Sequence, residues 1–163
     1  MQTTIVYVII TVCLFLIHSF LIPYLTIVHV SPDILLLWIV FLSIRRGQMV
    51  GTAVGFLIGL ILDLTSGEVS MLGLSALAKS IGGFAAGYFF NENRVFQILG
   101  SYQFVVAVGV ITLLHNAFYF LIFLQGTGIP VWDIFLHYAV SSSLYTALLA
   151  LLPMFVFARK HAS

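Results

Sequence analysis

Apolar stretches long enough to cross a lipid bilayer follow one another along almost the whole chain. Hydrophobic residues make up 62% of the 163 residues, whereas Asp, Glu, Lys and Arg together make up only 7%. A soluble domain carries about 25% charged residues, so a soluble globular protein is excluded. Intrinsic disorder is excluded because the chain is too apolar, and a net charge of +1 gives no positive excess for binding nucleic acid. The sequence therefore predicts an all-α, polytopic integral membrane protein.

Turn and cap signals divide the chain into six predicted membrane-spanning helices. A span takes about 20 apolar residues, so we expect one transmembrane domain over residues 1–163 and no soluble domain. The second helix is short for a span. Ser31 is its expected N-cap, Pro32 fits its first position, and Asp33 favours the positive end of its dipole. The predicted spans are about 4–22, 32–45, 48–64, 70–90, 96–124 and 131–157.

The basic residues predict how these helices are oriented. Five of the six Lys and Arg residues fall in turns or in the tail, on the same side of the membrane as the N-terminus. Basic residues in short loops stay in the cytoplasm, so we expect both termini to be cytoplasmic. The five residues are Arg45, Arg46, Arg94, Arg159 and Lys160.

A ladder of glycines at a spacing of four occupies the third predicted span. Gly51, Gly55 and Gly59 lie on one helical face, and Asp63 continues that face. Glycine lets membrane helices approach each other closely. The ladder indicates packing against a neighbouring span of this chain, docking of another protein's helix, or a groove for a ligand.

The fourth predicted span carries a similar stripe, in which Gly83 and Gly87 follow Lys79. Lys79 lies about halfway along this span, where a charge costs at least about 2.5–3.5 kcal/mol. It is either a functional charge for a ligand or coupling partner, or a lysine that bonds to backbone and hydroxyl groups or extends to the interface. Asp63 is the only acidic residue nearby in sequence, and it lies at a helix end. Because no partner is evident, the sequence favours tolerance of Lys79→Met.

Histidines and serines are the remaining polar residues inside predicted helices. His115 and Asn116 lie well within the fifth span and are expected to form an interhelical hydrogen-bonding pair. The chain has one cysteine and no HxxxH or HExxH spacing, so we expect no metal site and no cofactor. No base is specified beside the serines at 141–143, so we expect no catalytic residue and no enzymatic activity.

Several short stretches share their order and spacing with a known family. Ser31-Pro32-Asp33 precedes an apolar run, and Arg45-Arg46-Gly47 precedes the glycine ladder. The ladder ends in Leu60–Leu64, and Leu72–Leu77 precedes a glycine-rich helix. Together these stretches resemble the MreD family of rod shape-determining membrane proteins. The resemblance is strongest from Ser31 to Phe90.

The resemblance implies a non-enzymatic scaffold of the rod-shape and cell-elongation peptidoglycan synthesis complex in the bacterial cytoplasmic (inner) membrane. Its implied partners are MreC, a bitopic protein, and the elongation synthase, a SEDS glycosyltransferase paired with a class B penicillin-binding protein. We expect the glycine stripe and the short second helix to offer a concave surface for helix–helix docking. The candidate functional polar residues are Pro32, Asp33, Arg45, Arg46, Lys79 and His115.

The resemblance also supplies an alternative function. It implies a fold similar to the substrate-binding subunits of energy-coupling-factor vitamin transporters. The alternative is therefore a small-ligand (vitamin or lipid) binding or transport subunit of a membrane transporter. Lys79 suits this function, and the glycine stripe is compatible with both functions.

The charge distribution predicts which segments face outward. Residues around Arg94 and the tail after Phe157 should be cytoplasmic, whereas Glu68 and residues 126–130 should be outside. Cysteine labelling of intact cells measures this. We expect labelling near Glu68 and none near Arg94. Labelling near Arg94 would contradict the six-span arrangement.

Overall fold

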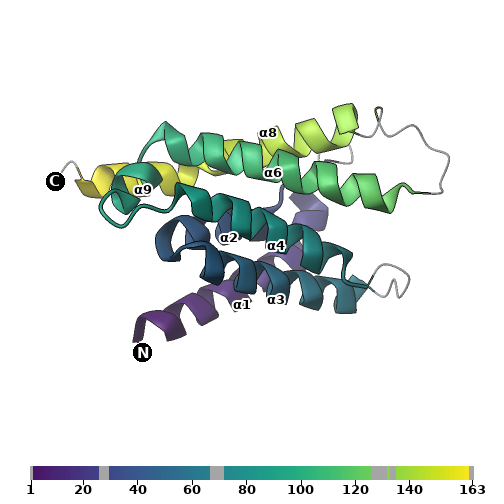
Figure 1. Ribbon diagram of the computed structural model, residues 1–163, viewed down its shortest axis with the longest axis horizontal. Coiled ribbons are helices and arrows are strands. Elements are labelled where there is room, and N and C mark those ends of the chain that lie inside the picture. The colour runs from purple at the N-terminus through teal and green to yellow at the C-terminus, as the bar shows by residue number, and fades with distance from the viewer. Residues whose placement is uncertain (1, 26–29, 67–71, 126–131, 133–134, 162–163) are drawn as a thin grey trace.

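The computed structural model describes residues 2–25, 30–66, 72–125, 132 and 135–161, and these residues are mostly helical (Figure 1). No β-strand occurs in these ranges. A 3-10 turn, η2 (Gly87–Phe89), and a π-helical turn, η3 (Phe135–Ala139), accompany the α-helices. The α-helices are α1 (Gln2–Leu25), α2 (Ile34–Arg46), α3 (Gln48–Ser66), α4 (Leu74–Ala86), α5 (Val95–Leu99), α6 (Tyr102–Phe123), α8 (Val140–Leu149) and α9 (Leu151–His161).

Three helical segments of the described chain are long and apolar enough to cross a membrane: Gln48–Thr65, Tyr102–Phe123 and Phe135–Arg159. Within α1, Thr4–Phe20 is a shorter apolar stretch. α2 and α4 have 13 residues each. At 1.5 Å per residue each is about 20 Å long, less than the roughly 30 Å hydrocarbon core. The all-helical class is confirmed, whereas the number of six spans stays a prediction.

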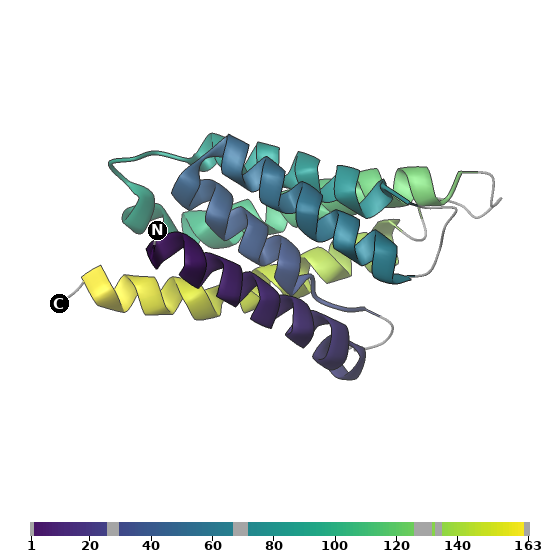
Figure 2. The same cartoon turned by 90° about the horizontal axis from the view of Figure 1, so that it is seen from below.

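α2 lies in the middle of the bundle (Figure 2). It contacts α1, α3, α4, α6 and α8. Its side chains Leu35 and Leu36, and all those from Trp38 to Ile44, are buried. Because neighbouring helices surround α2, its short length does not have to match the bilayer thickness. Leu37, Trp38 and Phe41 of α2 still line a hollow between α1 and α9, so a docking surface that includes this short helix stays a prediction.

The fourth and fifth predicted spans differ from the observed helices. The fourth, expected over 70–90, begins as a helix only after Gly73, which adopts a left-handed conformation with φ of 95°. The fifth, expected over 96–124, consists of two helices. α5 ends at Leu99, and α6 begins after Ser101, whose backbone is extended.

The sixth predicted span, expected over 131–157 with a bend at Pro153, is divided at Ala150. Proline has no N–H to donate, and its ring clashes with the carbonyl four residues earlier, here that of Leu149. The interruption therefore appears one turn before the proline. α8 and α9 still follow one another as one apolar segment.

The glycine stripe of α3 packs against α4 of the same chain, which lies alongside it (Figure 1). Gly51, Gly55 and Gly59 are buried, and a methyl group on any of them would overlap backbone atoms of α4. Gly83 and Gly87 face α3 in the same way. Because α4 already covers this face, the stripe has no room for a partner's helix. The docking role expected for the stripe is therefore wrong, and its role is internal packing.

The basic turn between α2 and α3 lies at the end of the bundle where α1 begins and α9 ends (Figures 1 and 2). The Arg45 guanidinium lies 5.6 Å from the ring centroids of Tyr7 and Phe96. Arg46 lies 5.1 Å from the Tyr7 ring centroid. Both arginines are in the last turn of α2, where a positive charge suits the helix dipole. Which side of the membrane this end faces stays a prediction.

Gly55 and Gly109 provide a matched test of the helix packing. A Cβ at Gly55 would overlap the Lys79 carbonyl, whereas a Cβ at Gly109 would meet only the Ala147 methyl at 3.5 Å. We expect Gly55→Ala to lower the free energy of unfolding in detergent by about 1–3 kcal/mol. Gly109→Ala should leave it unchanged or raise it by up to about 1 kcal/mol. Gly55→Leu should lower the abundance of the protein in membranes. Equal thermal stability of the two alanine variants would contradict the close approach.

Candidate functional site

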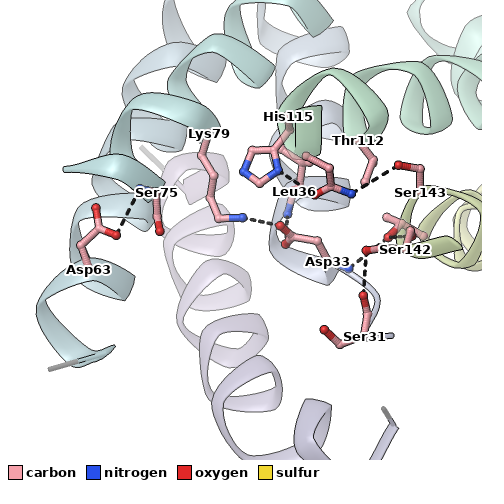
Figure 3. Close-up of polar contacts among 12 residues, drawn as sticks. Ser31, Asp33, Leu36, Asp63, Ser75, Lys79, Thr112, His115, Ser142 and Ser143 are labelled. Atoms are coloured by element: carbon pink, nitrogen blue, oxygen red, sulfur yellow. Dashed lines mark hydrogen bonds and ion pairs between the residues drawn. The ribbon is translucent and has the colours of Figure 1, made fainter. Parts of the chain in front are cut away.

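Polar side chains from several helices converge inside the bundle around Asp33 and Lys79 (Figure 3). Lys79 of α4 forms an ion pair with the carboxylate of Asp33, which precedes α2. The side chains of Lys79 and Asp33 are only 4% and 16% exposed. Lys79 therefore has a buried acidic partner that was not evident in the sequence. The two residues are 46 positions apart, so no local pattern connects them.

Asp33 connects the start of α2 to two other helices. Its Oδ1 accepts a hydrogen bond of 2.8 Å from the backbone N–H of Leu36, while its Oδ2 holds Lys79. Its own backbone N–H donates to Oγ1 of Thr146 on α8 over 3.0 Å. One carboxylate residue thus fixes α2, α4 and α8 relative to one another.

The start of α2 differs from the expected one. Asp33, not Ser31, is the N-cap, and Pro32 lies before the helix rather than at its first position. The carboxylate of Asp33 reaches the free N–H groups of the first turn, which shifts the start of the helix to Ile34. The carbonyl of Ser31 instead accepts a hydrogen bond of 2.8 Å from the hydroxyl of Ser142.

Asp63, near the end of α3, caps the start of α4. Its carboxylate oxygens accept hydrogen bonds from the backbone N–H groups of Gly73, Ser75 and Ala76 at 3.0, 3.1 and 3.1 Å. The carboxylate is buried at the positive end of the α4 dipole. Asp63 therefore joins the end of α3 to the start of α4, and Lys79 pairs with Asp33 instead.

His115 and Asn116 of α6 form the expected interhelical network. Nδ1 of His115 lies 3.2 Å from Oδ1 of Asn116. Nδ2 of Asn116 donates to the carbonyl of Ala139 over 3.2 Å and to Oγ of Ser143 over 3.3 Å. These bonds connect α6 to η3 and α8, and all four residues are buried.

A polar cavity of about 260 Å³ adjoins the ion pair. His18 of α1, Asp33, Lys79, His115 and Ser142 are among the residues that line it. Nε2 of His115 and Nδ1 of His18 are buried without a hydrogen-bond partner in the described part of the chain. A buried polar atom without a partner costs about 1–3 kcal/mol, so the cavity favours a polar guest. Within the described ranges, no three His, Cys, Asp or Glu side chains form a group that could hold a metal.

A second hollow is apolar and lies between α1, α2 and α9. It measures about 500 Å³, and its lining includes Tyr7, Trp38, Phe41, Arg45 and Phe157. The rings of Trp38 and Phe41 stack with their centroids 5.2 Å apart. Aromatic side chains line much of this groove, and Arg45 places a positive charge at one end of it.

The apolar helices and the buried ion pair define a helical membrane protein whose two buried charges neutralise each other inside the bundle. The model of the family "MreD: rod shape-determining protein MreD" matches residues 1–159. The chain therefore belongs to the MreD family, and membership implies a role in determining rod shape. This family is not a known enzyme family.

The match confirms the resemblance and covers the first, fifth and sixth predicted spans, where only hydropathy and length had supported it. No curated protein and no solved structure matches the chain. The expected likeness to substrate-binding subunits of energy-coupling-factor transporters therefore stays a prediction.

The buried pair reverses the expectation that Lys79→Met is tolerated. Removing one partner leaves the other charge buried without compensation, which costs about 3–5 kcal/mol. We expect Lys79→Met and Asp33→Asn, each alone, to lower the thermal stability of the purified protein and its abundance in membranes. The double variant should recover part of the loss, because no charge remains and Asn still caps α2. Single variants with wild-type stability would contradict this role of the pair.

Proposed function

We propose that this protein is a non-enzymatic scaffold of the rod-shape and cell-elongation complex that builds peptidoglycan. The match to the MreD family over residues 1–159 carries the proposal. The proposed partners are MreC and the elongation synthase, formed by a SEDS glycosyltransferase and a class B penicillin-binding protein. A chain made largely of apolar helices meets such partners through its lateral helix faces.

In this proposal the protein crosses the bacterial cytoplasmic membrane six times, with both termini in the cytoplasm. An even number of spans returns the chain to its starting side, and α1 begins at the end of the bundle where α9 finishes (Figure 1). Arg45 and Arg46 lie at that same end, which supports a cytoplasmic position for it. The short helix α2 crosses among neighbouring helices, and the short helix α4 crosses between α3 and α6.

The apolar groove between α1, α2 and α9 is the surface that we assign to the transmembrane helix of MreC. The glycine stripe is covered by α4, so docking has to use another face, and Trp38 and Phe41 of α2 line this groove. Tyr7, Trp38 and Phe157 line the groove, and aromatic side chains carry much of the energy at interfaces. One helix laid in the groove would contact α1 and α9 together.

Val6 and Val8 test this surface with the same substitution on the same helix. Val6 lines the groove and is 51% exposed, whereas Val8 is 58% exposed and does not line it. We expect Val6→Trp to fill the groove, lower co-purification of MreC about tenfold, equivalent to about 1.4 kcal/mol, and make rod cells round. Val8→Trp should leave MreC capture and cell shape unchanged. Both variants should reach wild-type abundance, because both sites are on the surface.

Two results would count against these proposals separately. Equal MreC recovery with Val6→Trp and Val8→Trp would exclude the groove as the docking surface. Failure of the wild-type protein, purified from native membranes, to bring MreC or elongation proteins with it would contradict the scaffold.

A second candidate function is a small-ligand (vitamin or lipid) binding or transport subunit. The polar cavity beside Lys79 favours it, because two of its histidine nitrogens lack partners among the described residues. The same purification distinguishes the two functions. A stoichiometric vitamin or lipid without cell-wall proteins would favour the transporter subunit.

A further inference from the structure

We propose that the polar cavity binds a neutral, hydroxyl-rich group of the size of one sugar or glycerol unit. This inference goes beyond scaffolding, since binding of such a group does not depend on the capture of MreC. Three features carry it: the ring nitrogens of His115 and His18 that lack a partner among the described residues, the internal neutrality of the Lys79–Asp33 pair, and the size of the cavity.

The hydrogen bonds around His115 assign its tautomer. Asn116 must direct Nδ2 toward the carbonyl of Ala139, because a carbonyl only accepts, and this leaves Oδ1 facing His115. Nδ1 of His115 therefore carries the proton and donates to that oxygen. In the neutral ring Nε2 is then an acceptor. His115 is only 6% exposed, and no described residue donates to its Nε2, so this nitrogen requires a donor from a guest.

The ion pair determines the charge of the guest. The ammonium of Lys79 and the carboxylate of Asp33 neutralise each other, so an ionic ligand would be buried without a counter-charge. Lys79 has three N–H donors, and within the described chain Asp33 takes one of them. A hydroxyl group donates and accepts at once. It therefore suits both the acceptor Nε2 of His115 and the remaining donors of Lys79.

The cavity volume limits the size of the guest. About 260 Å³ corresponds to roughly nine waters at about 30 Å³ each. The ring of Tyr119, which also lines the cavity, stacks on His115 with centroids 6.2 Å apart and gives an apolar wall for the C–H face of a guest. One sugar ring or glycerol unit fits these dimensions. Such a unit occurs both as a free molecule and as the headgroup of a glycolipid.

Nitrogen NMR of the full chain, labelled with ¹⁵N-histidine in phosphatidylcholine nanodiscs, tests the proposal. We expect Nε2 of His115 to resonate as an unprotonated nitrogen and to shift when glucose is added, or when the nanodiscs contain glucosyl diacylglycerol. A shift with glucose alone assigns the site to a free sugar, and a shift with the glycolipid alone assigns it to a headgroup. His137, which is exposed and outside the cavity, should not shift.

Variants of three histidines complete the test. His18→Phe leaves the hydrogen bonds of α6 intact and should weaken binding about twofold to tenfold, the effect of one lost hydrogen bond. His115→Phe should remove the shifted resonance, which assigns that resonance to His115, and His137→Phe should leave the shift at His115 unchanged. Absence of a shift at His115 in both arms, or an equal shift at His137, would overturn the proposal. MreC capture is assayed separately, so failure of the ligand site leaves the scaffold unaffected.

Discussion

A buried charge in a membrane bundle has to find its partner inside the protein, because lipid offers none. Asp33 and Lys79 meet this requirement, and the arrangement of the central helices depends on them. The same aspartate caps α2 and binds Thr146 of α8 through its backbone. Three helices thus meet at one residue, and the polar cavity lies where they meet.

Close packing of α3 on α4 places Lys79 at this meeting point. Gly55 lies directly against the backbone carbonyl of Lys79, so a larger residue there would move α4 away from α3. Asp63 fixes the start of α4 through the N–H groups of its first turn. The small residues and the capping carboxylate therefore position the ammonium group.

Hydropathy and spacing were sufficient to predict the helical membrane class and the hydrogen-bonded pair at His115, whereas for the glycines they left internal packing and partner docking both open. They were not sufficient for the enclosed position of α2, because periodicity does not say which helices become neighbours. They were not sufficient for the Lys79–Asp33 pair either, because Asp33, Asp63 and Asp133 all lie within other predicted spans and spacing does not say which of them reaches Lys79. The cavity could not be predicted from the sequence, because its walls come from separate helices.

The distance between the paired charges along the chain has a consequence for biogenesis. Lys79 is synthesised 46 residues after Asp33, and Thr146 follows 113 residues after it. At roughly 5–20 residues per second, the carboxylate waits about 2–9 s for its counter-ion. During this time α2 lacks both its charge partner and several of the helices that enclose it. The central helix of the bundle is therefore among the first to be made and among the last to reach its final environment.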